Sequence, residues 1–513
     1  MFKSKFLIFS SFFLFSKSLF SQQKGIDEII NEAFLPISSF WENLILHEFF
    51  GTGIPTIIYL LVGGAAFFTV YFGFINIRGF GISIKTVMGK YDKLDEDRSN
   101  NGEVSHFQAL ATAVSGTVGN GNIAGVAMAI ALGGPGATFW MILCGILGMS
   151  SKFVECTLGV KYREIGSDGT VYGGPMYYLK KGLSEIGYEK LGKFLGITFA
   201  ILCIGASFGG GNAAQSNQAA MQLVNSFGMT GGSARTIIGL IMMFVVGVII
   251  IGGIKRIASV TEKVVPFMAG IYVLACLYII FSNFSYIDDA FGLIFSEAFS
   301  PTAAVGGFIG VLIQGFRRGA FSNEAGAGSA SIAHSAVITS YPASEGLVAL
   351  LEPFIDTVVI CTMTALVIII FNGDNTMFTY GNTVGDGTAV MIQGQQLSGA
   401  GITSAAFSKY ISFSGPFLTI AVVLFALSTM ISWSYYGLQS WMYVFGKGKA
   451  ADLTYKILFL LFIVIGAAGD MSSVWAFSDA MILALVFPNM IGLFFLYPKV
   501  KSELLIYLEK IKK

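Results

Sequence analysis

A run rich in glycine and asparagine, SGTVGNGNIAG at residues 115–125, stands in the middle of a hydrophobic stretch long enough to cross a membrane. Its flanks, residues 107–114 and 126–132, are apolar. Glycine costs about 1 kcal/mol in a helix interior, and unpaired backbone groups in hydrocarbon cost more still. The run is stable there only if the opened backbone lines a cavity and finds other polar partners. Such openings in transporters bind substrates and coupling ions near the middle of the bilayer.

The composition indicates a membrane protein. The chain has 513 residues, of which 54% are hydrophobic and 12% are charged, whereas soluble domains carry about 25% charged residues. We therefore predict an all-α polytopic membrane protein embedded in a lipid bilayer. The net charge of +1 and the dispersed basic residues argue against a nucleic-acid partner. The five cysteines lie in apolar stretches and are interpreted as buried small hydrophobic residues, and the three histidines are scattered along the chain. Nothing in the sequence specifies an oligomeric state.

Hydrophobicity divides the chain into spans of about 20 apolar residues. We predict eleven transmembrane helices, at residues 52–76, 105–131, 137–160, 193–224, 234–254, 261–282, 302–336, 345–372, 414–445, 454–470 and 472–497. Together they form a transmembrane domain over residues 52–497. Between them, residues 283–300 are amphipathic, and the outer loop 373–413 has helical potential near residues 404–410.

The N-terminal segment and the basic residues of the loops give the predicted orientation in the membrane. Residues 1–21 resemble a secretory signal, with an uncleaved anchor as the alternative, so residues 22–51 would be exported. Lysine and arginine gather in the loops on one side, and the other side holds only Lys24, Arg235 and Lys409. The positive-inside rule makes the lysine-rich side cytoplasmic. This predicts a multi-pass protein of the plasma (inner) membrane, with the N-terminus outside and residues 498–513 as a cytoplasmic tail.

A second interruption is predicted in the span 302–336. Its centre, residues 314–328, contains Arg317, Arg318 and Glu324 among glycines. Charges at membrane depth are usually paired or face water, and they usually serve function. Alternatively, the two arginines lie in a cytoplasmic loop between shorter spans. If the first span is set apart, the two interruptions fall in the first and sixth of ten spans, which predicts two inverted five-helix repeats, at about residues 105–282 and 302–497.

Three further polar clusters lie within spans. Ser428, Thr429 and Ser432 occupy one helix face, where they could give oxygen ligands to a small cation or only bond to their own helix. Asn212, Gln215 and Gln218 share another face and serve either packing or cavity lining. The third cluster is a polar stripe for which structural hydrogen bonding is favoured, at Glu352, Asp356, Thr357 and Thr364.

Five segments resemble the alanine or glycine:cation symporter family, within the group that shares the LeuT-type fold. They are residues 118–126, 133–148, 172–177, 318–326 and 432–437. The resemblance extends from about residue 52 to residue 497, in the family's order. It implies one extra helix before a five-plus-five inverted repeat. Two residues depart from the family pattern: Asn120 replaces a more usual threonine, and Ile142 replaces a frequent tryptophan.

The breaks and the resemblance together predict sodium-coupled uptake of a small neutral amino acid, alanine or glycine, by alternating access. Backbone amides near the first break would bind the carboxylate, and Trp433 would limit side-chain size. The predicted substrate-binding residues are Thr117, Gly119, Asn120, Gly121, Asn122, Gln215, Asn323 and Trp433. Sodium would bind at Ser115, Val118, Phe425, Ser428 and Thr429. The gating or structural polar residues would be Arg317, Arg318, Glu324 and Asp356.

Other functions stay open at this stage. Proton coupling in the same fold could use Glu324 or Asp356 as the carrier. A channel is disfavoured because there are two interrupted spans and no repeated filter sequence. An enzyme is not expected, because the sequence shows no nucleophile–base pair and no metal-ligand motif. No phosphate-binding loop is expected either, since the glycines of residues 119–125 lack the required spacing and follow no strand.

Overall fold

The fold is described from a computed structural model that covers residues 26–94, 102–300, 307–385, 387–412 and 414–512. The predicted signal, residues 1–21, lies outside the described residues. The described chain is largely helical, as the composition predicts. In it, seven helical stretches are long and apolar enough to cross a membrane: Ala137–Tyr162, Glu189–Phe227, Gly253–Ser282, Pro342–Phe371, Ser414–Phe445, Lys449–Ala468 and Met471–Lys510. Three shorter apolar helices are Thr56–Tyr71, Gly121–Gly133 and Ala234–Ile250.

The individual elements divide several of these stretches. The long straight helices are α8 (Ala137–Tyr162), α12 (Ala234–Ile250), α13 (Gly253–Ser282), α21 (Ser414–Phe445) and α22 (Lys449–Ala468). Composite stretches are α10 (Glu189–Phe208), η4 (Gly209–Ala213) and α11 (Ala214–Phe227); α17 (Pro342–Val348), α18 (Leu351–Pro353), η6 (Phe354–Cys361) and α19 (Thr362–Phe371); and α23 (Met471–Ala484) with α24 (Val486–Lys510). Near the N-terminus are α2 (Ile26–Ile45), α3 (Thr56–Tyr71), α4 (Ile75–Arg78), α5 (Phe80–Val87) and η1 (Asp92–Leu94).

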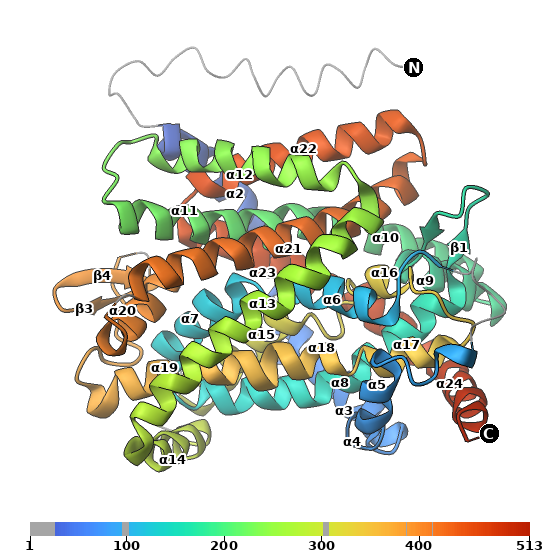
Figure 1. Cartoon of the computed structure of the whole chain (residues 1–513), viewed down its shortest axis with the longest axis horizontal. Coiled ribbons are helices and arrows are strands. Elements are labelled where there is room, and N and C mark those ends of the chain that lie inside the picture. Colours follow the sequence, from blue (N-terminus) through green and yellow to red (C-terminus); the bar gives the residue numbers. More distant parts are fainter. Residues whose placement is uncertain (1–25, 95–101, 301–306, 386, 413, 513) are drawn as a thin grey trace.

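Figure 1 shows the long helices side by side, with connecting elements gathered at the two ends of the molecule. One end carries α14 (Ile287–Ala298), α20 (Ala400–Tyr410) and the hairpin of β3 (Ala389–Ile392) and β4 (Gln395–Ser398). The helices at residues 287–298 and 400–410 match the sequence prediction; the hairpin was not predicted. The other end carries α9 (Pro175–Glu185), the hairpin of β1 (Glu164–Ile165) and β2 (Val171–Tyr172), and the C-terminus. Short 3₁₀ turns are η5 (Phe284–Tyr286) and η7 (Gly373–Asn375).

The first predicted interruption is present. Helix α6 (His106–Thr117) begins at a capping box made by Ser105 and Gln108, and it ends just before Val118. After Val118–Asn120 the chain continues as a π-helical turn, η3 (Gly121–Gly125), and then as α7 (Val126–Gly133). All residues from Val126 back to Ala109 are buried. The opened backbone therefore lies inside the protein rather than in lipid, as the energetic argument requires.

The second interruption is present but lies later than predicted. Helix α15 (Gly307–Asn323) contains both arginines, so the alternative that Arg317 and Arg318 lie in a loop is wrong. The helix stops at Glu324, which has a left-handed φ of 54°, and only a short helix, α16 (Ser331–His334), follows. The earlier glycines serve packing: a Cβ on Gly315 would lie 2.5 Å from the Ala137 carbonyl oxygen. Glycine there lets α15 approach α8 closely without opening the helix.

Candidate functional site

The two interruptions border one small enclosed hollow. Its volume is about 10 Å³, room for about one water molecule, and it is lined by Gly116, Thr117, Gly121, Gly210, Gln215, Phe321, Glu324, Thr429, Trp433 and Ile482. These residues come from α6 and η3, from η4 and α11, from the end of α15, and from α21 and α23. The hollow thus brings together a carboxylate, a carboxamide, two hydroxyls and an indole. Its apolar walls are the side chains of Phe321 and Ile482. Ligand sites commonly combine a few such convergent polar groups with apolar walls.

Asn122 braces the first break. Its Oδ1 accepts a hydrogen bond of 2.8 Å from the Gly119 amide. Its Nδ2 donates to the Asp356 side chain at 2.6 Å and to the Asp356 carbonyl at 3.0 Å. The opened turn is therefore tied to η6 on the far side of the break. Both ends of the Asn122 side chain are hydrogen-bonded within the protein, and Asn122 does not line the hollow.

Asn120 and Gln215 form a second link across the opened backbone. The Asn120 amide donates to Gln215 Oε1 at 2.9 Å, and Asn120 Nδ2 donates to the Gln215 carbonyl at 3.2 Å. Gln215 Nε2 in turn donates to the Gly210 carbonyl at 3.0 Å. Gln215 lines the hollow, whereas the Asn120 side chain turns toward the α11 backbone. Asn120 can thus act on the hollow through the position of Gln215.

Four of the five residues predicted for sodium come together beside the hollow. The Ser115 hydroxyl donates to the Ser428 carbonyl at 2.8 Å, and the Thr429 hydroxyl donates to the Ser115 carbonyl at 3.1 Å. The Ser428 hydroxyl donates to the Phe425 carbonyl at 3.0 Å. Val118, the fifth predicted ligand, is the fully buried residue at which α6 ends. The set consists of uncharged oxygens, which are ligands that hard cations accept.

The second break contributes Glu324. One carboxylate oxygen, Oε1, accepts a hydrogen bond of 2.9 Å from Trp433 Nε1, and the other accepts from Ser329. Both Glu324 and Trp433 line the hollow, and Trp433 packs where glycine leaves room for it: a Cβ on Gly211 would lie 2.2 Å from Trp433 Cγ. Asn323 instead donates to Thr357 at 3.0 Å and caps the Ala325 amide, so it does not line the hollow.

Asp356 connects the two breaks. Besides Asn122, it accepts hydrogen bonds from the Ser322 hydroxyl at 2.8 Å and from the Thr357 hydroxyl at 2.6 Å. Ser322 belongs to the last turn of α15 and Asn122 to η3, so one buried carboxylate holds both opened segments at once. Of the polar stripe, Asp356 and Thr357 thus support the site, whereas Glu352 pairs with Lys152 and Thr364 bonds to Tyr272.

Arg317 and Arg318 meet a carboxylate that the sequence analysis did not single out. Both pair with Asp479 of α23: Arg317 Nε lies 2.7 Å from its Oδ2, and Arg318 Nη1 lies 3.1 Å from its Oδ1. The Arg318 guanidinium also lies 5.3 Å from the centre of the Trp475 ring, which stacks on Phe321. Phe321 lines the hollow, so this ion pair covers one side of it.

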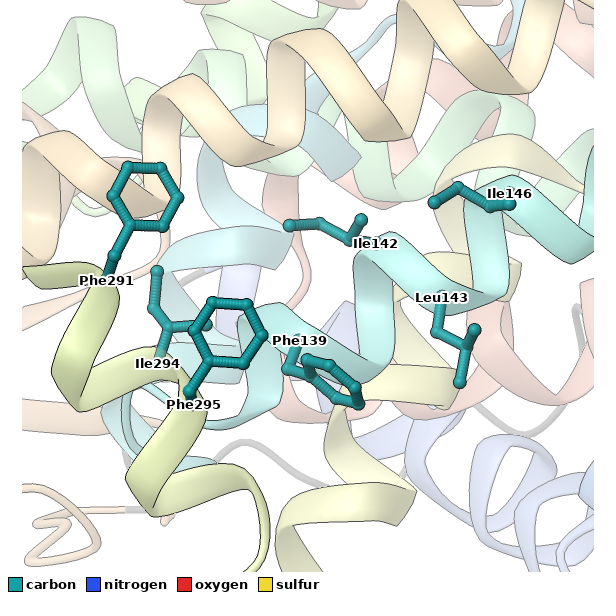
Figure 2. A pocket seen from close by; sticks show the side chains of 7 residues that line it. All are labelled: Phe139, Ile142, Leu143, Ile146, Phe291, Ile294 and Phe295. Atoms are coloured by element: carbon teal, nitrogen blue, oxygen red, sulfur yellow. The ribbon is translucent and has the colours of Figure 1, made fainter. Parts of the chain in front are cut away.

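A larger hollow lies apart from these polar groups. Its volume is about 150 Å³. Figure 2 shows it between α8 and α14, with walls of apolar side chains. These are Phe139, Ile142, Leu143, Ile146, Phe291, Ile294 and Phe295. Nothing in these walls can hold the charges of an amino acid. Ile142, one of the two departures from the family pattern, faces this hollow.

We predict that Ile142→Trp stabilises the protein. A tryptophan would fill part of the hollow and add van der Waals contacts, which drive helix packing in membranes, worth about 1 kcal/mol for some ten atom pairs. The midpoint of thermal unfolding in detergent should rise by roughly 1–3 °C, and uptake should not change because the hollow is remote from the polar site. A lower unfolding midpoint would show that Ile142 already fills the space between α8 and α14.

The architecture defines the class of protein. A helical membrane protein whose two interrupted helices enclose a polar hollow, with further breaks in η4 and η6 around it, is built like a secondary transporter. The comparison with known sequences is specific. The chain belongs to the sodium:alanine symporter family, whose model matches residues 41–513.

Individual relatives agree with this assignment. The chain is 41% identical to the sodium/alanine symporter AgcS of Methanococcus maripaludis, over 88% of this chain and 93% of that protein. It is 35% identical to the amino-acid carrier protein AlsT of Bacillus subtilis, over 85% of each chain. Its fold is similar to the crystal structure of MhsT in complex with L-phenylalanine, with a TM-score of 0.50 and 15% identity over 78% of this chain and 99% of that one. The chain is thus a multi-pass membrane protein and a cation-coupled amino-acid transporter.

Proposed function

We propose that the protein couples the uptake of a small neutral amino acid, alanine or glycine, to the entry of sodium by alternating access. One observation carries the proposal: the hollow between the two broken helices directly adjoins a set of buried, uncharged oxygens, and Thr429 belongs to both. Occupation of the oxygen set by a cation would therefore fix a wall of the substrate site.

The sodium ion would bind the carbonyls of Ser115, Val118 and Phe425 and the hydroxyls of Ser428 and Thr429. The two hydroxyls already face carbonyls of the same set at 3.0–3.1 Å. On binding sodium they would turn their lone pairs to the ion, which joins α6 to α21. Inward movement of each positive charge gains about 2.3 kcal/mol per 100 mV of membrane potential, in addition to the sodium gradient.

The hollow would widen to admit the amino acid, whose charged ends would lie at different walls. Its carboxylate would reach the amides of residues 119–121, displacing the Gln215 oxygen from the Asn120 amide. Its ammonium would face Glu324, the acidic residue among those that line the hollow. Trp433, Phe321 and Ile482 would limit the side chain. One methylene is worth about 1–3 kcal/mol in an apolar pocket, so size alone would separate glycine from alanine only weakly.

The same proposal includes the topology. Eleven spans would comprise α3 as the extra helix and two inverted five-helix repeats, the first from α6 to α13 and the second from α15 to α24. The end of the molecule with α14 and α20 would face outward, and the end with α9 and the C-terminus would face the cytoplasm (Figure 1). The described N-terminal helix, α2, would then lie outside.

A panel of labelled amino acids in proteoliposomes tests the function. Alanine or glycine should accumulate against its gradient when sodium is high outside, and not when potassium or choline replaces sodium. Accumulation driven by a pH gradient in sodium-free buffer would instead establish proton coupling, and flux that neither saturates nor runs uphill would establish a channel. Uptake of none of the small neutral amino acids would contradict the proposed substrate.

Asn120→Thr should change substrate selection. The substitution removes the hydrogen bond to the Gln215 carbonyl and leaves Gln215 freer to move at the wall of the hollow. We expect the ratio of alanine to glycine uptake, measured by competition, to change by roughly 3- to 10-fold, the effect of about 1 kcal/mol. Gln218→Ala is the control. Gln218 lies on α11, as Gln215 does, but it accepts a hydrogen bond from the Ala400 amide instead of contacting Asn120. An unchanged ratio would show that Asn120 has no influence on the site.

A further inference from the structure

A group of charged side chains is buried apart from the hollow. It consists of Lys152 of α8, His334 of α16, Glu345 of α17 and Glu352 of α18, which we call the His334 cluster. All four side chains have no exposed surface. Buried charges are costly in a membrane protein and usually mark a functional path. The cluster takes no part in the proposed binding of the amino acid or of sodium.

His334 lies between two carboxylates. Its Nδ1 is 2.5 Å from Glu345 Oε1, and its Nε2 is 3.6 Å from Glu352 Oε2. Among the described residues, neither Nε2 nor that Glu352 oxygen has a hydrogen-bond partner, while the other Glu352 oxygen binds Lys152 at 2.9 Å. A neutral imidazole carries one N–H, so one of its nitrogens would turn a lone pair to a carboxylate. Only the imidazolium can donate to both.

The charges of the cluster lead to the same requirement. With His334 and the neighbouring His106 both neutral, Lys152, Glu345 and Glu352 leave one uncompensated negative charge away from water. A proton on His334 makes the cluster neutral, which removes a large desolvation cost. Other titratable or charged groups around the cluster are Glu155, Cys156, Arg163, Tyr178, Glu324 and Tyr436. Glu155 accepts hydrogen bonds from the Gly326 amide and from Asn489, so neutral donors already satisfy one of its oxygens.

A path connects His334 with the surface. His106, the first residue of α6, contacts the second oxygen of Glu345 through Nδ1, and its side chain is 10% exposed. Glu345 therefore bridges a partly exposed imidazole and a buried one. A proton from water can bind His106, pass to the Glu345 carboxylate, and after rotation of the carboxyl bind His334. The far end of α6 carries Gly116 and Thr117, which line the hollow.

We propose that His334 is a proton-binding site, loaded from the cytoplasmic end through His106 and Glu345, whose occupancy sets how firmly α16 is held to α17 and α18, where Glu345 contacts the first residue of α6. Loss of the proton leaves Glu345 and Glu352 without their shared partner and weakens this attachment. Cytoplasmic pH would then control how readily α6 moves and the amino acid is released. That the proton enters from the cytoplasmic side rests on the orientation given under the proposed function. The proton site itself does not depend on that orientation.

Histidine NMR tests the proton site without any transport. The chain has three histidines, so selective ¹³C labelling of the ring gives three signals, and His334→Gln identifies one of them. We expect that signal to titrate within about pH 5 to 11. Glu345→Gln, which leaves the histidine in place, should move the midpoint by about 1 pH unit or more. His47→Gln is the control and should leave the His334 signal unchanged. A His334 signal that does not titrate in this range would overturn the proposal and make the cluster a fixed structural link.

Proteoliposomes test the consequence for transport. With external pH and sodium held constant, the initial uptake rate of the wild type should change by about 2-fold or more as the internal pH goes from about 6 to about 10. His334→Gln and Glu345→Gln should remove this dependence and keep the sodium dependence, and His47→Gln should keep both. Retention of the internal pH effect in His334→Gln would overturn the regulatory role. Absence of alanine and glycine uptake in the wild type would contradict the proposed function instead and leave the NMR result to decide on the proton site.

Discussion

Thr429→Ala should raise the sodium concentration needed for half-maximal uptake by about 10- to 100-fold. The substitution removes one oxygen of the proposed sodium site, and a hydrogen bond or ligand contact to a charged group is worth about 1.5–3 kcal/mol. Alanine keeps the Cβ and favours the helix, so the fold should be preserved. The Thr429 hydroxyl lies 3.1 Å from the Ser115 carbonyl and also borders the hollow. Initial uptake rates in proteoliposomes at graded sodium measure the effect, and high sodium should restore much of the rate.

The matched control lies on the same helix. Thr419 is also buried in α21, but its hydroxyl bonds to Ser226 at 2.6 Å and to the Gly415 carbonyl at 2.8 Å, away from the hollow. Thr419→Ala should leave the half-maximal sodium concentration within about 2-fold of the wild type. A substitution that shares no partner with the sodium site should not couple to it. If Thr429→Ala and Thr419→Ala behave alike, the sodium site is not at Ser115 and Thr429.

The sequence was sufficient to predict the two broken helices, because their energetic signals are strong. Glycines and amides at residues 115–125 are too costly in lipid-exposed helix, and the structure opens the chain there. The position of the second break was less predictable. Gly315 and Gly319 resemble helix breakers in sequence, yet a Cβ on Gly319 would lie 2.9 Å from Cys144 Cβ. Glycines that open a helix and glycines that let two helices touch look alike until the neighbouring helix is known.

The directions of side chains and the pairing of residues far apart in the chain could not be predicted from the sequence. Asn120 faces Gln215 rather than the hollow because the backbone turns at Val118, where ψ is 88°. His106 and His334 stand far apart in the chain, and Asp479 is one acid in an apolar helix, so no local pattern joined them to Glu345 or to the two arginines. The β3–β4 hairpin was missed because its turn uses Gln393 and Gly394, both with positive φ, instead of the usual asparagine and glycine.

Gly119→Ala should nearly abolish sodium-dependent uptake while the protein still folds. A Cβ at this position would lie 2.4 Å from the Thr429 hydroxyl oxygen and 2.9 Å from Gln215 Oε1. Both neighbours are held by hydrogen bonds, so the methyl group must push apart the sodium oxygens and the wall of the hollow. Overpacking typically costs about 1–3 kcal/mol, and here it acts on the proposed sodium site and the proposed substrate site together. We expect uptake at a fixed, subsaturating sodium concentration to fall by at least about 10-fold.

Gly125→Ala is the control for this experiment, since it adds the same methyl group to the same opened segment. There the nearest atom to a new Cβ is a ring carbon of Trp475 at 3.5 Å, an ordinary van der Waals contact. Its uptake and sodium dependence should stay near those of the wild type, and size-exclusion profiles should show equal yields of folded protein for both variants. Wild-type sodium dependence in Gly119→Ala would mean that Thr429 and Gln215 are free to move away without loss of function. The close approach of the broken helix to α21 would then play no part in coupling sodium to the amino acid.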